Sequence, residues 1–197
     1  MKVVLASQNR HKLEEIQAIL SGFDMELVLQ SDLGLHIDVD ETGTTFEENS
    51  YLKAKAVMDA TGLPAIADDS GLTVDVLGGA PGIYSARYGA PECKTDRDRL
   101  NHLLKNMRGV RSEERTARFV CVITLLYPDG RKLVARGFCE GMIAFEPGGD
   151  DGFGYDPVFY VPSMGCTFAQ MGSERKNAIS HRANALHRLE AMLDASE

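Results

Sequence analysis

The stretch Pro64-Ala65-Ile66-Ala67-Asp68-Asp69-Ser70-Gly71 places two adjacent carboxylates at the end of an apolar run. The apolar residues predict a buried strand, and Ser70-Gly71 predicts the turn that leaves it. Adjacent carboxylates repel each other. A divalent cation such as Mg²⁺ offsets this repulsion, since it prefers one or two protein carboxylates together with water and phosphate oxygens. The alternative is a pair of solvated loop acids.

The bulk composition narrows the class of protein. The chain has 197 residues, which suffices for one good core, and no linker or repeat divides it. We therefore treat residues 1–197 as a single domain. The net charge of −8 argues against general nucleic-acid binding, which needs a basic surface, and so we expect no nucleic-acid partner. A small anionic substrate remains compatible with local clusters of basic residues.

Cysteine spacing and hydropathy indicate the cellular setting. Cys93, Cys121, Cys139 and Cys166 lie far apart without a C-x-x-C pair, and we expect them to be reduced core residues. The chain shows no signal-peptide pattern and no apolar run near the roughly 20 residues of a membrane helix. We expect a cytoplasmic protein with no membrane partner.

Apolar periodicity and turn signals predict interleaved helices and strands on both sides of the opening stretch. The strands are expected at residues 3–6, 25–29, 72–76, 119–127 and 132–145, and the helices at residues 13–22, 45–61, 95–107 and 173–193. Pro128-Asp129-Gly130 is a good signal for a hairpin between the last two strands. These elements predict an α/β fold with a mixed sheet.

A polar segment, Ser7-Gln8-Asn9-Arg10-His11-Lys12, lies between the first predicted strand and its helix. The unpaired N–H groups and positive dipole end of a helix start suit a phosphate group. Ser7 and Asn9 add side-chain donors, and Lys12 adds a positive charge. The alternative is an ordinary helix cap flanked by surface cations, since the segment lacks the glycines of a P-loop.

An acidic segment that contains Asp38, Asp40 and Glu41 precedes the second predicted helix. If this loop and the opening stretch meet at one sheet edge, Glu41 completes a metal site with Asp69. Lys53, about two turns into the helix, could reach the same place. The alternative is a solvated acidic loop followed by an exposed lysine.

Four glycines in the seven positions 148–154 surround Phe153. They let the backbone bend and present the aromatic ring with little crowding. Such a ring suits stacking on a nucleobase, worth roughly 1–3 kcal/mol in nucleic-acid complexes, and Asp156 is placed to accept hydrogen bonds. The alternative is a glycine-rich turn that Phe153 and Tyr155 anchor to the core.

Polar residues also fill the first turns of the last predicted helix, over residues 176–182. Lys176 and Ser180 are four residues apart and are expected to share a face. Arg182 offers a forked donor to a carbonyl oxygen, and His181 can donate or accept. Cations near a helix N-terminus oppose the dipole, and this conflict weakly favours a functional role over a solvated face.

Together these segments give the chain a resemblance to the inosine/xanthosine triphosphate pyrophosphatases, which hydrolyse aberrant purine nucleoside triphosphates to the monophosphate and pyrophosphate. The resemblance runs from Val3 to about Leu189. Its motifs are S-Q-N-R-H-K at 7–12, E-T-G-T-T-F-E-E-N at 41–49, L-K-A-K at 52–55, A-D-D-S-G-L at 67–72, G-G-A-P-G-I-Y-S-A-R-Y at 78–88, G-F-G-Y-D-P-V-F at 152–159 and K-N-A-I-S-H-R at 176–182. Gln8, where many members have glycine, and Ser50, where alanine is common, are small departures.

The resemblance implies an elongated mixed β-sheet flanked by helices, with two lobes and a central cleft, and a homodimer. It implies a Mg²⁺-dependent enzyme, with one or more ions per subunit, that acts on ITP, dITP and XTP. The implied metal ligands are Glu41, Asp69 and Asp68, and the implied catalytic residue is Asp69. The implied triphosphate site comprises Ser7, Gln8, Asn9, Arg10, His11, Lys12 and Lys53. The implied base pocket comprises Phe153, Tyr155, Asp156, Lys176, His181 and Arg182, and Ser70 and Gly154 are further substrate contacts.

Two points of chemistry follow from that resemblance. An aspartate with a pKa near 3.9 is a poor proton acceptor, so Asp69 is either a general base in a raised-pKa environment or a metal ligand that orients water. Arg182 can donate to the 6-oxo group of hypoxanthine or xanthine, whereas adenine would leave it unpaired at a cost of about 1–3 kcal/mol. The alternatives are a pyrophosphatase with another base preference and a nucleotide-binding sensor without turnover.

Overall fold

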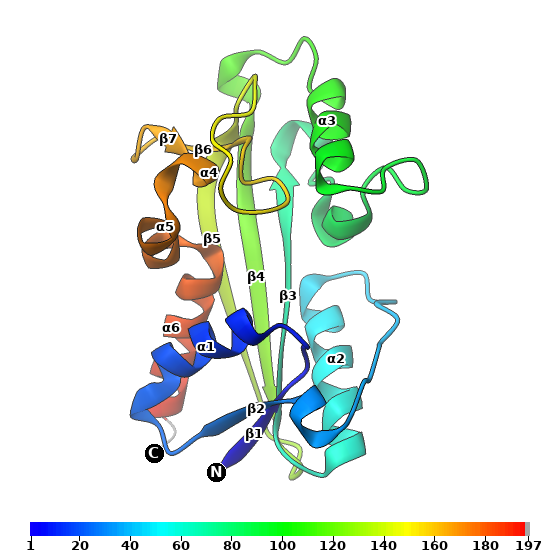
Figure 1. Ribbon diagram of the computed structural model, residues 1–197, viewed down its shortest axis with the longest axis vertical. Coiled ribbons are helices and arrows are strands. Elements are labelled where there is room, and N and C mark those ends of the chain that lie inside the picture. The colour runs from blue at the N-terminus through cyan, green and yellow to red at the C-terminus, as the bar shows by residue number, and fades with distance from the viewer. Residues whose placement is uncertain (196–197) are drawn as a thin grey trace. The chain divides into compact units, whose positions relative to one another are not determined.

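A computed structural model describes residues 1–195, apart from the side chains of His11 and Ser173. Its strands form a seven-stranded sheet in the order β2-β1-β3-β4-β5-β6-β7 (Figure 1). β1 pairs in parallel with β2 and β3, whereas β6 pairs antiparallel with β5 and β7, so the predicted mixed sheet is confirmed. The strands are β1 Lys2–Leu5, β2 Glu26–Leu29, β3 Ala65–Val74, β4 Thr116–Leu126, β5 Lys132–Ile143, β6 Phe159–Val161 and β7 Cys166–Thr167.

Helices flank this sheet, as predicted (Figure 1). The α-helices are α1 Arg10–Ile19, α2 Phe46–Thr61, α3 Asp96–Asn106, α4 Phe168–Met171, α5 Ser173–Ile179 and α6 His181–Asp194. Short 3₁₀ helices connect them: η1 Leu20–Gly22, η2 Gln30–Leu33, η3 Asp75–Leu77, η4 Gly82–Arg87 and η5 Ser112–Glu114.

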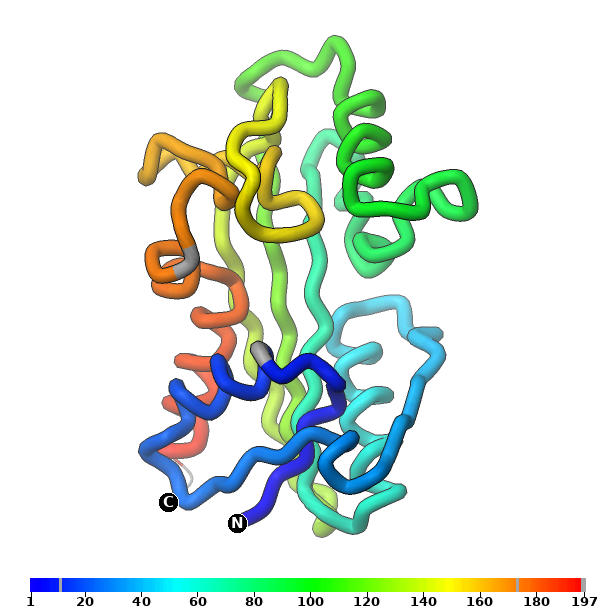
Figure 2. The backbone as a smooth tube through the Cα atoms, in the orientation of Figure 1, coloured from blue at the N-terminus to red at the C-terminus, as the bar shows by residue number. Residues whose placement is uncertain are grey.

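The chain divides into two compact units. The first comprises Met1–Asp69, Cys121–Gly137 and the chain from Asn184 onward, and the second comprises Ser70–Val120 and Phe138–Ala183. The start of the chain and the end of α6 both belong to the first unit (Figure 2). The expected single domain and the expected cleft stay predictions.

In the first unit, α1 and α6 cover one face of the strands and α2 covers the other (Figure 1). The buried cluster on the first face includes Val3, Leu5, Leu13, Ile16, Ile66, Leu186 and Leu189. The clusters on the second face include Val4, Ala54, Val57, Ala65, Ala67 and Leu126. Successive residues of β1 and β3 thus alternate between the two faces, as the strand period requires.

β3 passes through the acidic pair without a turn. It is one strand from Ala65 to Val74, so the turn predicted at Ser70-Gly71 is wrong. Leu72 and Val74 are fully buried, and this packing outweighs the local turn preference of a Ser-Gly pair. The strand ends at Val74, two residues before the predicted end at Val76, because η3 begins at Asp75.

The predicted starts of α2 and α3 and the predicted hairpin are confirmed. The Thr45 side chain accepts a hydrogen bond from the Glu48 backbone N–H at the start of α2. Thr95 and Asp98 form a capping box at the start of α3. The Tyr127 N–H donates to the Arg131 carbonyl at 2.9 Å, which closes the turn between β4 and β5.

The last predicted helix is two helices, and this is a correction. Ser180 separates α5 from α6 with an extended backbone (φ −65°, ψ 154°). Its hydroxyl accepts from the Ala183 N–H at 3.1 Å, so Ser180 caps α6. Lys176 and Ser180 therefore do not share a helix face. The cap offered by Ser180 outweighs the apolar spacing that suggested continuity.

The second unit is held together by an aromatic cluster and by one buried cation. The Phe159 ring lies 4.6 Å from the Phe119 ring and 4.8 Å from the Phe168 ring, centroid to centroid. Arg115 is only 3% exposed and donates to three backbone carbonyls at 2.7–3.0 Å, those of Ile143, Met107 and Ala144. Arg115 thereby ties the end of α3 to the end of β5.

Two further expectations can be compared with the described residues. None of the helices in residues 1–195 is long and apolar enough to cross a membrane. None of the four cysteines, all within that range, is in a disulfide. Cys121 and Cys139 are buried as expected, whereas Cys93 and Cys166 are only half-buried, and Cys166 packs against the core of the second unit.

Candidate functional site

Asp68 and Asp69 point to opposite faces of the sheet because they are consecutive residues of one strand. Asp68 accepts from Lys12 Nζ of α1 at 2.6 Å, on the face that α1 covers. Asp69 accepts from Lys53 Nζ of α2 at 2.9 Å, on the other face. Both carboxylates are buried. Each has its own lysine, so the structure relieves their repulsion by separating them.

Asp69, Glu41 and Lys53 form one connected group of predicted residues in the first unit. Lys53 Nζ donates to Asp69 Oδ1 at 2.9 Å and to Glu41 Oε1 at 2.8 Å. Burial alone lowers the pKa of Lys53, but the two carboxylates hold that pKa above its ordinary value. Burial raises the pKa of Asp69, and Lys53 opposes this shift. A raised pKa makes Asp69 a better proton acceptor than an exposed aspartate.

Asn49 joins this group, although we did not predict a role for it. It lies one turn into α2, is fully buried, and its Nδ2 donates to Asp69 Oδ2 at 3.4 Å. Its Oδ1 accepts from the Gly43 N–H at 2.8 Å. The motif that carries the resemblance ends at Asn49, and this was the available signal in the sequence.

The segment 7–12 caps α1 with its own side chains. Ser7 Oγ accepts from the Asn9 N–H at 3.1 Å, and Asn9 Oδ1 accepts from the Lys12 N–H at 3.4 Å. Arg10 pairs with Asp32 at 2.8 Å. Gln8 is exposed, and the His11 side chain lies outside the described part of the chain. The segment is therefore a helix cap with cations, and a phosphate role for it stays a prediction.

In the second unit, Asp156 organises the glycine-rich loop. It is buried, and its Oδ2 accepts from the Phe153 N–H at 2.9 Å and from Lys176 Nζ at 2.5 Å. A Cβ on Gly152 would lie 2.3 Å from that same oxygen, and Gly152 has φ +82°. Only glycine fits this position, which lets the loop fold onto Asp156.

The sequence left open whether the aromatic residues of this loop present a ring to a base or anchor the loop to the core, and Phe153 and Tyr155 differ in this respect. The Phe153 side chain is 66% exposed and lies 4.7 Å from Lys176 Nζ, measured to the ring centroid. Tyr155 is buried and its hydroxyl donates to the Ser85 carbonyl at 2.9 Å. Phe153 is thus the presented ring, and Tyr155 is the anchor. The Gly154 N–H donates to Asp96 Oδ2 at 3.0 Å, a support that we did not predict.

The remaining predicted residues also belong to the second unit. The His181 ring is buried and stacks on the Phe119 ring at 4.9 Å between centroids. Arg182 and Ser70 are half-buried. The structure directly joins Phe153, Asp156 and Lys176, whereas His181 starts a separate helix, α6.

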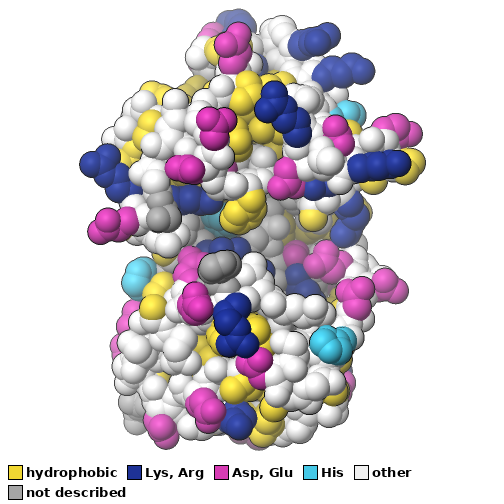
Figure 3. Space-filling view, in the orientation of Figure 1, with side chains coloured by type: hydrophobic (Ala, Val, Ile, Leu, Met, Phe, Trp, Pro, Cys, Tyr) yellow, Lys and Arg dark blue, Asp and Glu magenta, His cyan; other side chains and the backbone are white. Residues whose placement is uncertain are grey.

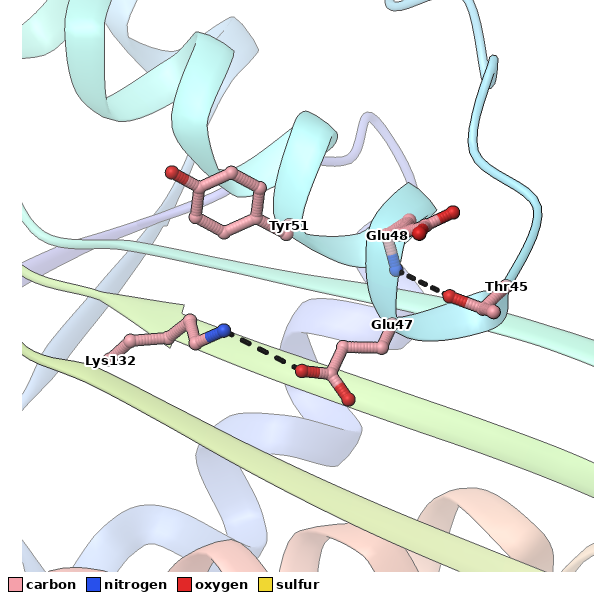
Figure 4. A pocket seen from close by; sticks show the side chains of 5 residues that line it. All are labelled: Thr45, Glu47, Glu48, Tyr51 and Lys132. Atoms are coloured by element: carbon pink, nitrogen blue, oxygen red, sulfur yellow. Dashed lines mark hydrogen bonds and ion pairs between the residues drawn. The ribbon is translucent and has the colours of Figure 1, made fainter.

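An open pocket of about 330 Å³ lies beside the start of α2 and is not the predicted site (Figure 4). It is lined by Thr45, Glu47, Glu48, Tyr51 and Lys132. Lys132 pairs with Glu47 at 3.5 Å, and the Thr45 hydroxyl accepts from the Glu48 N–H. The polar groups of this pocket thus interact with each other. On the face shown in Figure 3, Lys and Arg side chains lie interspersed with Asp and Glu side chains.

The donor set suits a divalent cation, although the carboxylates do not form a ready-made metal group. Among the described side chains, no three His, Cys, Asp or Glu residues cluster closely enough to hold a metal ion. Glu41 and Asp69, however, direct carboxylate oxygens at one positive charge, that of Lys53. Such hard oxygen donors are those that Mg²⁺ prefers.

Comparison with known proteins identifies the family. A model of the Ham1 family matches residues 3–192. The chain belongs to the Ham1 family. This Ham1 family member is 51% identical over 196 residues to the dITP/XTP pyrophosphatase of Escherichia coli K12, which spans 98% of this chain and 97% of that protein. It is 52% identical over 189 residues to the dITP/XTP pyrophosphatase of Thermus thermophilus. This match covers 96% of this chain and 90% of that protein.

A solved structure shows the same fold. The Ham1 protein of Staphylococcus aureus is 43% identical to this Ham1 family member and superposes with a TM-score of 0.92 over 100% of both chains. The resemblance stated from the sequence is therefore confirmed. The roles of the individual site residues stay predictions.

Proposed function

We propose that this protein hydrolyses the aberrant purine nucleoside triphosphates dITP, ITP and XTP to the nucleoside monophosphate and pyrophosphate. Its membership of the Ham1 family and its 51% identity to a dITP/XTP pyrophosphatase support this activity. The observation that carries it within the structure is the Glu41–Lys53–Asp69 group, in which two carboxylates and an ammonium converge. Anionic phosphates and a cation are the ligands that such a group suits.

We propose Mg²⁺ as the cofactor, held by Glu41 and Asp69 with Asp68 as a further carboxylate. The oxygen donors of Glu41 and Asp69 already accept from one cation, Lys53 Nζ. When bound, the ion supplies charge neutralisation at the phosphorus that is attacked. Because Asp68 lies on the other face of β3, its contribution is expected to be smaller than that of Asp69.

The protein's own side chains bind the triphosphate and direct the water. Lys53 and Lys12 carry ammonium groups next to Asp69 and Asp68, and they are placed to neutralise phosphate oxygens. Asp69 orients the water that attacks the α-phosphorus, which releases pyrophosphate. Ser7 to Asn9 lie immediately before the start of α1, where the positive end of the helix dipole favours a phosphate group.

The base is proposed to stack on Phe153, the exposed ring of the glycine-rich loop. Lys176 contacts that ring and pairs with Asp156, so it links the Phe153 ring to the buried carboxylate. Arg182 and His181 are proposed to read the 6-oxo group of the base. Adenine carries an amino group at that position. Because this group and Arg182 are both donors, no hydrogen bond would form between them.

The activity is tested by incubation of the protein with dITP, ITP, XTP, GTP and ATP in the presence of Mg²⁺. We expect pyrophosphate as the first product from dITP, ITP and XTP, with much lower rates for ATP and GTP. Orthophosphate as the first product would contradict the proposal. Tight binding of dITP without any product would instead indicate a nucleotide sensor.

The base-stacking role predicts a selective effect of Phe153→Ala. Because the ring is 66% exposed, its removal is expected to leave the melting temperature nearly unchanged. The KM for dITP is expected to rise about 5- to 160-fold, since a stacked base contributes roughly 1–3 kcal/mol. Steady-state kinetics and thermal unfolding measure the two effects. An unchanged KM would exclude Phe153 from the base pocket.

We also propose a homodimer, as the resemblance implies, and a location in the cytoplasm. Light scattering after gel filtration tests the dimer, with a mass of twice 21.5 kDa as the expected result.

A further inference from the structure

We infer that Asn49 is a positioning residue that holds the Asp69 carboxylate and ties the loop bearing Glu41 to it. This inference rests on the proposed function, in which Glu41 and Asp69 serve the same reaction. Asn49 is fully buried in α2, where a polar side chain is stable only if its donors and acceptors are satisfied. Its amide makes one contact to each of the two segments that it joins.

The chemistry of the two contacts determines which way the amide points. The backbone N–H of Gly43 can only donate, so the oxygen Oδ1 of Asn49 must face it, at 2.8 Å. The NH₂ group of Asn49 is thereby directed at Asp69 Oδ2, at 3.4 Å. Lys53 holds the other oxygen, Oδ1, at 2.9 Å. The Asp69 carboxylate is thus held from both sides by residues of α2.

The loop approaches Asn49 too closely for any side chain on residue 43. A Cβ on Gly43 would lie 2.6 Å from Asn49 Oδ1 and 2.7 Å from Glu48 Cβ. Glycine therefore allows the loop to reach the helix, two residues after Glu41. A change at Asn49 is expected to affect Asp69 directly and Glu41 through this loop.

Two substitutions of Asn49 separate positioning from simple structural support. Asn49→Ala removes both contacts, whereas Asn49→Asp keeps an oxygen for the Gly43 N–H but replaces the donor to Asp69 with a carboxylate. Thr45→Ala is the matched control, because it removes the cap of the same helix without touching Asp69. All four proteins are assayed for pyrophosphate release from dITP, below their melting temperatures.

We expect Asn49→Ala to lower kcat about 10- to 100-fold with little change in the KM for dITP, as for residues that orient a catalytic group. Asn49→Asp is expected to lose at least as much, although it keeps the loop contact. Thr45→Ala is expected to lower the melting temperature and leave kcat near that of the wild type. A nearly wild-type kcat in folded Asn49→Ala, or in Asn49→Asp, would overturn the inference.

A measurement without turnover keeps the test decisive if the variants do not fold. In ¹⁵N-labelled protein, the side-chain amide signal of Asn49 is expected to shift on Asp69→Asn. The amide of Asn106, which donates to Tyr88 Oη, is the internal control that should not move. An unmoved Asn49 signal would overturn the inference even in an active enzyme. Absence of pyrophosphate release from the wild type would instead refute the proposed function.

Discussion

Asp69→Asn is expected to lower kcat for pyrophosphate release from dITP by about 10³-fold, the scale on which a catalytic acid–base group contributes. The amide keeps the shape of the side chain but loses the charge that we propose binds Mg²⁺ and orients water. Folding raises the pKa of Asp69, so its ionised form opposes folding at neutral pH. The neutral amide therefore leaves the melting temperature near that of the wild type. Initial rates and thermal unfolding measure both effects.

Asp68→Asn is the matched comparison, because it changes the adjacent residue on the opposite face of β3. It removes the negative charge that pairs with Lys12, and we expect a smaller loss of kcat together with a higher Mg²⁺ concentration for half-maximal rate. Equal losses in the two variants would contradict the division of roles between the faces. A nearly normal rate in Asp69→Asn would remove Asp69 from the reaction.

Arg115→Met is expected to lower the free energy of unfolding by about 3–5 kcal/mol, the largest effect on stability that we predict. The methionine fills part of the volume but leaves the Ile143 and Ala144 carbonyls without the Arg115 donor, whereas the Met107 carbonyl keeps its hydrogen bond from the Val110 N–H. Each such carbonyl costs about 1–3 kcal/mol, and partial hydration reduces the sum. Urea unfolding followed by circular dichroism measures the change.

Arg111→Met is the control for that experiment. Arg111 is four residues earlier in the chain, but its side chain is 68% exposed and pairs with Glu113 and Glu114 on the surface. Exposed ion pairs contribute at most about 1 kcal/mol, so this variant should unfold close to the wild type. If Arg115→Met is no less stable than Arg111→Met, the Ile143 and Ala144 carbonyls are satisfied in another way.

Local signals in the sequence predicted much of the fold. Thr45 and Thr95 mark helix starts because their hydroxyls satisfy backbone donors, and this chemistry is local. The Pro128-Asp129-Gly130 turn is also determined locally, because the hydrogen bond that closes it joins Tyr127 and Arg131. Ser180 shows the limit: its cap competes with an apolar spacing that runs through it, and only the packed structure decides between them.

The candidate site was predictable as a set of residues but not as an arrangement. The motifs point to Glu41, Lys53 and Asp69, which do meet in the first unit. The separation of Asp68 and Asp69 onto opposite faces, each beside its own lysine, was not predicted, because the turn expected at Ser70-Gly71 concealed the continuous strand. Asn49 was missed because a buried helix amide has no distinctive local signal, and its role depends on contacts far along the chain.

Side chains alternate along β3, so the face to which each aspartate points depends on the number of strand residues before it. Deletion of one residue between Ala65 and Ala67 would shift every later side chain of the strand to the other face. The carboxylate now beside Lys53 would then meet α1, and its neighbour would take its place beside α2. The chain would still read Asp-Asp, yet its two acids would have exchanged lysines. Alignments that allow a gap in this strand therefore risk assigning the reaction to the wrong aspartate.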